Sequence, residues 1–424
     1  MTNLIFAHAS EIATPTGRSA VYGSAMNRLR VIHDGAVVVE NGIIRAVGLT
    51  REIQRQFDAD RYQWIDVKGK TIVPGFVDSH THFIFAGYRP DEFFMRLQGK
   101  SYMDIMNAGG GIQNTVEATR NVSFNDLFHL SLHRLDAMLA FGITTVEGKS
   151  GYGLDKKTEI KQLEVIKKLN ETHPVDVVPT FLGAHAVPGE FSGRNKEYIE
   201  FLISEVMPEV VDRKLAEFCD VFCEKGVISI ELSRRLLKAA KAMGLHLKLH
   251  ADEIEPIGGA ELAAELHATS ADHLLEASDE GIRRLSAEKV IATLLPETAF
   301  CLKKPYASAR QMIDTGCAVA LASDYNPGSC FTNSVPLLFA LACIYMKMSA
   351  EEALTAMTLN GAAALNRADR IGSIEEGKQA DLVILQDPGY QFLAYHTAVN
   401  LVETVVKKGE IVRSSTIKPV NTEV

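Results

Sequence analysis

The stretch Thr71-Ile-Val-Pro-Gly-Phe-Val-Asp-Ser-His-Thr-His82 is the most informative feature of the chain, because its apolar run ends in two histidines that are separated by one residue. Side chains of a strand alternate between its two faces, so His80 and His82 are expected to point to the same side. Two convergent imidazoles at a strand end can bind a divalent metal through neutral nitrogens. A chance His-x-His on a surface turn would look the same, so the interpretation depends on partners elsewhere in the chain.

Seven further apolar runs follow this stretch, and the segments between them have helical patterns. Together with 71–78, the predicted strands are 143–147, 175–182, 219–223, 246–250, 270–273, 290–294 and 317–323. One of the helices is expected over 123–141, with Ser123 as its N-cap and Gly142 after its end. Strands that alternate with helices indicate parallel pairing. Eight such units predict an α/β fold, a (β/α)8 TIM-like barrel over residues 71–371.

The two ends of the chain lack this alternation. Residues 36–47 read as two short strands joined by the turn Asn41-Gly42, and 380–385 reads as another strand. Each end is short for a domain of its own. We therefore expect residues 1–70 and 372–424 to form one small β-sandwich together.

Composition narrows the class of protein. The chain has 424 residues, of which 46% are hydrophobic and 23% charged, so it can bury a large core. Its net charge is −9 and no basic block stands out, which argues against nucleic acid as a partner. No apolar run reaches the roughly 18 residues that span a bilayer. With no signal-like N-terminus, a soluble cytoplasmic protein without a membrane partner is expected. Cys219 and Cys223 could bind metal or form a disulfide, but buried free thiols are favoured.

Polar residues gather at the predicted C-terminal ends of the strands, where barrels of this kind carry their sites. His80 and His82 end the first strand, His250 ends the fifth, and Asp324 follows the eighth. Three imidazoles and one carboxylate suit Zn²⁺ or Fe²⁺ and leave a position open for water. The same level also carries His185, Glu253, His273, Asn326, Gly328 and Ser329.

These segments resemble the amidohydrolase superfamily, and the resemblance covers essentially the whole chain. It is carried by 74–82, 148–153, 180–188, 250–253, 270–273 and 323–329. Within the superfamily, the chain is similar to enzymes of histidine degradation. That similarity implies a homodimer that hydrolyses the cyclic amide C–N bond of 4-imidazolone-5-propanoate to N-formimidoyl-L-glutamate. Because the fourth strand, Cys219–Glu224, offers no bridging lysine, one divalent metal per subunit is expected, zinc or iron.

Roles for individual residues follow from their chemistry together with the resemblance. Asp324 is expected to be both a metal ligand and a proton acceptor, Glu253 a proton shuttle, and His273 an oxyanion stabiliser or relay. Which of the three acts as general base stays open. Arg89 is the candidate for gripping the substrate carboxylate, because a guanidinium can donate two parallel hydrogen bonds. The expected substrate contacts are Arg89, Tyr102, Tyr152, His185, Glu253, Asn326, Gly328 and Ser329.

Two other readings compete with this one. Another mononuclear amidohydrolase, such as a guanine-type heterocycle deaminase, would share the metal ligands and differ in its substrate loops. A non-catalytic relative would be expected to have lost ligands, whereas all four ligand positions and Glu253 are present. The long first connection, 83–122, is expected to serve the active site as a flexible loop.

Overall fold

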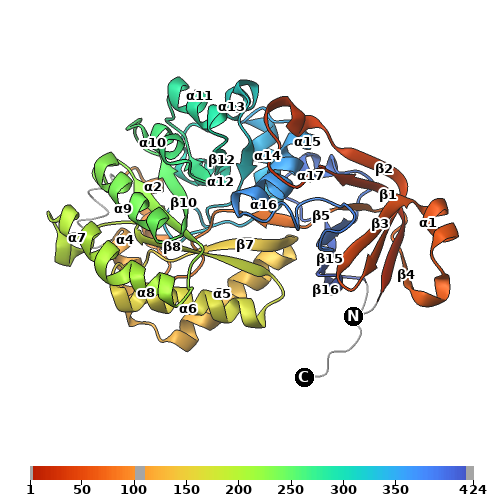
Figure 1. The fold of residues 1–424 in the computed structure, drawn as a ribbon, viewed down its shortest axis with the longest axis horizontal. Coiled ribbons are helices and arrows are strands. Elements are labelled where there is room, and N and C mark those ends of the chain that lie inside the picture. Colours follow the sequence, from red (N-terminus) through yellow and green to blue (C-terminus); the bar gives the residue numbers. More distant parts are fainter. Residues whose placement is uncertain (1–2, 101–109, 417–424) are drawn as a thin grey trace.

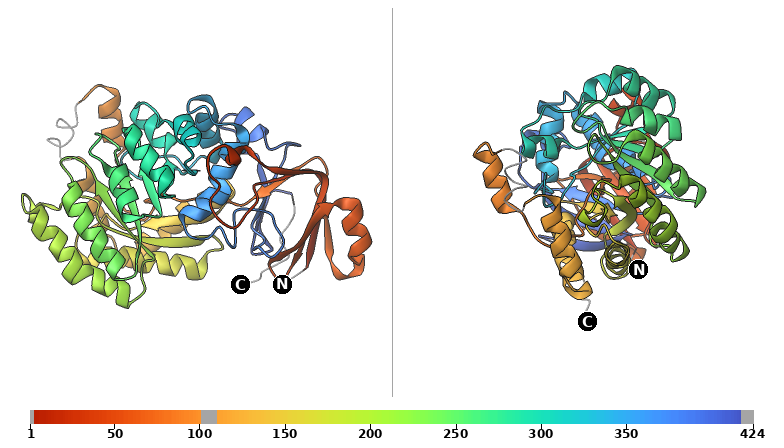
Figure 2. Two further views of the ribbon diagram at one scale, coloured as in Figure 1. Left: turned by 45° about the horizontal axis from the view of Figure 1, so that its top comes forward. Right: turned by 90° about the vertical axis from the view of Figure 1, so that its left-hand side faces the viewer.

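The computed structural model describes residues 3–100 and 110–416, and within them it has two sheets of eight strands each (Figure 1). The middle of the chain builds a parallel barrel, and the two ends build a separate sheet. Figure 2 shows that the terminal sheet lies to one side of the barrel and that α-helices form the outer layer of the barrel.

The barrel strands run in sequence order around the sheet, and all neighbours are parallel. They are β6 (Phe76–Asp78), β7 (Ile143–Lys149), β8 (Asp176–Ala184), β9 (Phe218–Cys223), β10 (His246–Ala251), β11 (Ser270–His273), β12 (Ile291–Leu294) and β13 (Val319–Leu321). Beyond the strand ends, the Asp324 N–H donates to the His80 carbonyl and the His82 N–H donates to the Tyr325 carbonyl, both at 3.0 Å. These two bonds join the last strand to the first, and the predicted barrel is confirmed.

Helices between the strands pack their apolar faces on the barrel. Within the described residues the α-helices are α1 (Thr50–Gln56), α2 (Pro90–Leu97), α4 (Ile112–Asn121), α5 (Phe124–Ala140), α6 (Lys156–Thr172), α7 (Asn195–Phe201), α8 (Met207–Asp212), α9 (Ile230–Ala242), α10 (Gly259–Leu266), α11 (Asp279–Ala287), α12 (Pro296–Leu302), α13 (Ala309–Thr315), α14 (Val335–Ile344), α15 (Ala350–Thr355), α16 (Gly361–Ala364) and α17 (Phe392–Tyr395). In α5 the Ser123 side chain accepts from the Asp126 N–H, as the N-cap prediction requires. Leu127 and Leu135 of α5 pack in one buried cluster with Val146 of β7.

The terminal sheet has the order β16-β15-β14-β5-β1-β2-β3, with β4 paired to β1. Its strands are β1 (Leu4–Thr14), β2 (Arg30–Glu40), β3 (Ile43–Leu49), β4 (Gln63–Asp66), β5 (Thr71–Pro74), β14 (Leu382–Leu385), β15 (Val402–Lys407) and β16 (Glu410–Ser414). Alternate residues of β1 are buried on opposite faces of this sheet: Leu4 and Phe6 on one, Ile5 and Ala7 on the other. The small domain expected from the two chain ends is therefore present, and hydrogen bonds join its strands into one sheet.

One predicted strand, 71–78, is wrong as a single element. It is divided at Gly75 into β5, which lies in the terminal sheet, and β6, which opens the barrel. A Cβ on Gly75 would lie 2.3 Å from Thr144 Oγ1, so only glycine lets the chain pass there. An apolar run shows burial but does not show that the chain changes sheets within it.

The six cysteines all lie in described residues and are all free, so Cys219 and Cys223 are the buried thiols expected. Within residues 3–100 and 110–416, no helix combines the length and apolarity needed to cross a membrane.

Candidate active site

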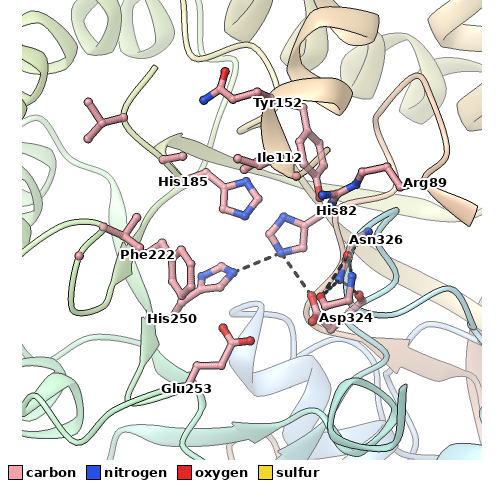
Figure 3. A pocket seen from close by; sticks show the side chains of 18 of the residues that line it. His82, Arg89, Ile112, Tyr152, His185, Phe222, His250, Glu253, Asp324 and Asn326 are labelled. Atoms are coloured by element: carbon pink, nitrogen blue, oxygen red, sulfur yellow. Dashed lines mark hydrogen bonds and ion pairs between the residues drawn. The ribbon is translucent and has the colours of Figure 1, made fainter. Parts of the chain in front are cut away.

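Three histidines and one aspartate converge at the C-terminal ends of β6, β10 and β13. His82 Nε2 lies 3.2 Å from His80 Nε2 and 3.2 Å from His250 Nε2. Asp324 Oδ1 lies 3.6 Å from His80 Nε2 and 3.4 Å from His82 Nε2. In Figure 3, His82, His250 and Asp324 point toward one another from separate elements. All four side chains are buried.

This donor set fits a divalent cation. Tetrahedral ligands at about 2.0–2.1 Å from zinc lie roughly 3.3 Å from one another, close to the separations found here. Burial holds the pKa of His80 and of His82 well below the usual range, so both imidazoles are neutral at neutral pH. Burial also raises the pKa of Asp324 to about 7 against the hydrogen bond from the Thr298 hydroxyl, and an adjacent cation would reverse that shift. Neutral nitrogen lone pairs and a buried carboxylate that converge on one point are chemically complementary to a metal ion.

The backbone at the site adopts conformations that are unusual for residues with side chains. Asp324 has φ 56° and His273 has φ 75°. Such strain is found most often at functional sites, where the surrounding structure holds the residue in place. For Asp324 that support includes the hydrogen bond from its N–H to the His80 carbonyl. The first and last barrel strands therefore fix the metal-ligand candidates relative to one another.

A cavity of ≈ 630 Å³ opens above these residues. Its wall includes His82, His250 and Asp324, and Glu253 and His273 stand beside them, with His273 Nε2 at 3.5 Å from Glu253 Oε2. Burial raises the pKa of Glu253 to about 8, and the nearby Asp324 charge adds to this. Burial lowers the pKa of His273 well below the usual range. At neutral pH the cavity thus places a carboxylic acid that holds its proton beside a neutral imidazole.

Arg89 and Arg96 make one part of the cavity wall cationic. The Arg89 side chain is 10% exposed, and its Nη1 lies 3.5 Å from Glu92 Oε2. Glu92 Oε1 accepts from the Gly111 N–H at 2.8 Å, so only part of its charge faces the guanidinium. Arg96 adds a second guanidinium, whose Nη2 donates to the Gly328 carbonyl at 2.5 Å. Two guanidiniums against one carboxylate leave this part of the wall with a net positive charge.

Gly328 allows the Arg89 guanidinium to occupy this position. A Cβ on Gly328 would lie 1.9 Å from Arg89 Nη2, a distance that no side chain can share. The loop that carries Gly328 is held by Asn326, whose Oδ1 accepts from the Gly328 and Ser329 N–H groups at 2.8 Å each. Asn326 Nδ2 donates to the Asp324 carbonyl at 2.6 Å. The Asn326 side chain thus links the loop at Gly328 to the backbone of Asp324, the acidic ligand candidate.

The sequence model of the amidohydrolase family matches residues 71–412. The chain belongs to the amidohydrolase family. It is 58% identical over 410 residues to an imidazolonepropionase of Clostridium tetani, covering 97% of this chain and 98% of that protein. It is 57% identical to an imidazolonepropionase of Parabacteroides distasonis, over 97% of this chain and 99% of that one.

Solved structures support the fold of this amidohydrolase at much lower identity. A guanine deaminase of E. coli matches with a TM-score of 0.73 and 16% identity, over 98% of this chain and 100% of that one. An adenosine deaminase of Xanthomonas campestris with bound zinc matches with a TM-score of 0.64 and 19% identity, over 97% and 93%. At such identities the likeness concerns the architecture alone.

The residues expected at the site of this amidohydrolase come together in the structure. Those of them that line the cavity are His82, Arg89, Tyr152, His185, His250, Glu253, His273, Asp324, Asn326, Gly328 and Ser329. His80 lies with its Nε2 against His82 and Asp324. Tyr102 falls outside the described residues.

Sequence reasoning missed two charged residues of the cavity wall, Glu92 and Arg96. Both lie on α2, three and seven residues after Arg89, which is the spacing of one helical face. Reading α2 with a helical period from Arg89 would have found them.

Proposed function

We propose that the protein hydrolyses the cyclic amide C–N bond of 4-imidazolone-5-propanoate to give N-formimidoyl-L-glutamate, a step of L-histidine catabolism. The observation that carries the proposal is a single cavity whose wall holds both a metal-ligand set and a net positive region around Arg89. A heterocycle with a carboxylate tail fits that polarity. The relatives that share 53–58% of their residues with this chain and are named imidazolonepropionases support it.

The proposed ligands are His80, His82, His250 and Asp324, which would hold one divalent ion per subunit, zinc or iron. When bound, such an ion polarises a carbonyl oxygen and activates water as a nucleophile. Residues of the chain would accept and donate the protons that the reaction requires. Asp324 would accept the proton that the attacking water loses.

Glu253 and His273 would complete the reaction at the ring. As the carbonyl carbon gains oxygen and the C–N bond breaks, the leaving nitrogen needs a proton. The protonated Glu253 carboxyl can supply it. His273, neutral in its buried position, can donate a hydrogen bond to the developing oxyanion.

The remaining residues of the cavity would position the substrate. Arg89 binds the propanoate. His185 Nδ1–H donates to the Gly151 carbonyl at 3.0 Å, which leaves Nε2 as an acceptor for a ring N–H. Burial raises the pKa of Tyr152, so its phenol stays a donor. Ser329 and the Gly328 backbone would contact the substrate from the loop that Asn326 holds, and Tyr102 stays a further candidate.

The proposal is tested by the turnover of 4-imidazolone-5-propanoate with and without a chelator. We expect loss of the substrate absorbance in untreated protein, no loss after chelation, and recovery on addition of zinc or ferrous iron. Metal analysis of the recovered enzyme distinguishes the two metals. Release of ammonia from guanine in place of ring opening would favour the deaminase alternative.

We also propose a cytoplasmic homodimer. Light scattering coupled to gel filtration should give about twice the mass of one chain, and a monomeric mass would contradict it. Fractionation of the source cells tests the compartment.

Glu253→Gln should lower kcat by about a hundredfold or more, because the amide cannot donate a carboxyl proton. The pH profile provides the sharper result. With a pKa raised to about 8, the acid form of Glu253 is present below that pH and is lost above it. Activity of the wild type should therefore fall as the pH rises through this range, and the variant should lack this limb. An unchanged kcat would exclude Glu253 as the proton donor.

A further inference from the structure

Within the described residues, a cluster of five charged side chains is fully buried inside the barrel, and none of these five lines the substrate cavity. They are Glu147 and Lys149 on β7, Asp220 on β9, Lys248 on β10 and Asp272 on β11. Charges removed from water are costly unless they are closely paired. A group of five within one barrel therefore needs an explanation beyond packing.

Each ammonium lies between two carboxylates. Lys149 Nζ is 2.7 Å from Asp220 Oδ2 and 2.9 Å from Glu147 Oε2. Lys248 Nζ is 2.9 Å from Glu147 Oε2 and 3.6 Å from Asp272 Oδ2. Burial alone would lower the pKa of Lys149, but the charges of the neighbouring carboxylates outweigh it and raise the pKa. Lys149 thus stays charged inside the barrel.

Two of the three carboxylates also contact the metal-ligand candidates. Asp272 Oδ2 lies 2.5 Å from His80 Nδ1, and Asp220 Oδ2 lies 3.0 Å from His250 Nδ1. These are the same oxygen atoms that face the lysines. A carboxylate behind Nδ1 fixes the rotation of an imidazole and directs its Nε2 toward a metal.

The third histidine shows that this support is selective. Among the described residues, no carboxylate lies within ion-pair distance of His82 Nδ1, and the one carboxylate contact of this ring is from Nε2 to Asp324. Its ring instead stacks on His185, with centroids 5.0 Å apart and an interplanar angle of 23°. His80 and His250 therefore each contact a carboxylate through Nδ1, whereas the ring of His82 stacks on His185 in the cavity wall.

We infer that Lys149 and Lys248 are positioning residues for the metal centre. Their ammonium groups hold Asp220 and Asp272 against the Nδ1 atoms of His250 and His80, so that both imidazoles present Nε2 to the ion. Without the lysines, three carboxylates would repel one another at the centre of the barrel. Asp220 and Asp272 could then no longer fix the orientation of the two imidazole rings.

The test measures metal binding, not turnover. Full-length Lys149→Met and Lys248→Met are stripped of metal, and the zinc dissociation constant is measured by competition with a chromophoric chelator. We expect each variant to bind zinc about 10–100-fold more weakly than the wild type. Substitution with cobalt should also change the visible spectrum, because that spectrum reports the geometry of the ligands.

Lys407→Met is the matched control. Lys407 of β15 is also buried, with a side chain 2% exposed, and its Nζ lies 2.7 Å from Asp381 Oδ2 and 2.9 Å from Asp176 Oδ2 of β8. Among the described residues, neither carboxylate forms an ion pair with a metal-ligand candidate. The Lys407→Met variant should lose thermal stability to a similar extent and bind zinc as the wild type does. Equal zinc affinity in Lys149→Met and wild type, or equal weakening in Lys407→Met, would overturn the inference.

If a lysine variant does not fold, Asp220→Asn provides a second test. This substitution preserves the shape of the side chain and removes its charge. It should also bind zinc more weakly, and unchanged affinity would count against the inference. The inference depends on the proposed metal but not on the proposed substrate. Failure of the wild type to bind zinc or iron would remove the proposed function as well, whereas normal binding in every variant would remove this inference alone.

Discussion

His250→Ala should abolish stoichiometric metal binding and lower kcat/KM by at least about a thousandfold. Three imidazoles and a carboxylate surround one point, and His250 lies on the side opposite Asp324 in Figure 3. Its loss leaves three donors and removes the imidazole that faces the Asp220 carboxylate. A metal ion contributes several kcal/mol to stabilising charge in the transition state, which corresponds to about a thousandfold or more in rate. Metal content by mass spectrometry and steady-state kinetics provide the two measurements.

His246→Ala is the matched control on the same strand. His246 begins β10, four residues before His250, and its ring is exposed and packs against Phe218. It should retain metal and activity. A fully active, metal-loaded His250→Ala would contradict the ligand assignment. Parallel losses in both variants would show instead that β10 tolerates no substitution.

The barrel could be predicted because parallel strands are buried on both faces and therefore read as apolar runs. Seven of the eight runs correspond to single barrel strands, and the helix expected over 123–141 is observed as α5 (Phe124–Ala140). The exception is the run 71–78, which is divided at Gly75 into β5 and β6. The apolar residues on both sides of Gly75 are buried in different sheets, and hydrophobicity alone cannot report such a transfer.

The site could be predicted only where position along a strand determines position in space. The C-terminal ends of parallel strands meet at one level, so His80, His250 and Asp324 could be grouped from sequence. Lys149 and Lys248 could not. A lysine within a strand normally indicates an exposed face, and only the packed barrel shows that these two lie inside it among carboxylates.

Arg89→Ala should raise KM for 4-imidazolone-5-propanoate far more than it lowers kcat. The guanidinium is buried, and its only carboxylate partner in the described residues, Glu92, is 3.5 Å away and also accepts from the Gly111 N–H. It therefore has donors left for a substrate carboxylate. Removing one partner of a buried charge pair costs roughly 2–4 kcal/mol, or about 30- to 1000-fold in binding. Arg283→Ala, which removes an exposed arginine of α11, is the control and should leave KM unchanged. A wild-type KM in Arg89→Ala would remove the assignment.

Gly328→Ala tests whether the position of the Arg89 guanidinium matters in addition to its charge. The new methyl group would stand 1.9 Å from Arg89 Nη2, so the guanidinium must move although its charge remains. We expect KM to rise by about tenfold or more, since a displaced guanidinium loses the paired geometry that a carboxylate requires. If the effect passes through Arg89, the two substitutions should not add. Gly328→Ala should then change KM little once Arg89 is already alanine. Full additivity in this double-mutant cycle would mean that Gly328 acts on the substrate directly, through its own backbone, and not by leaving room for Arg89.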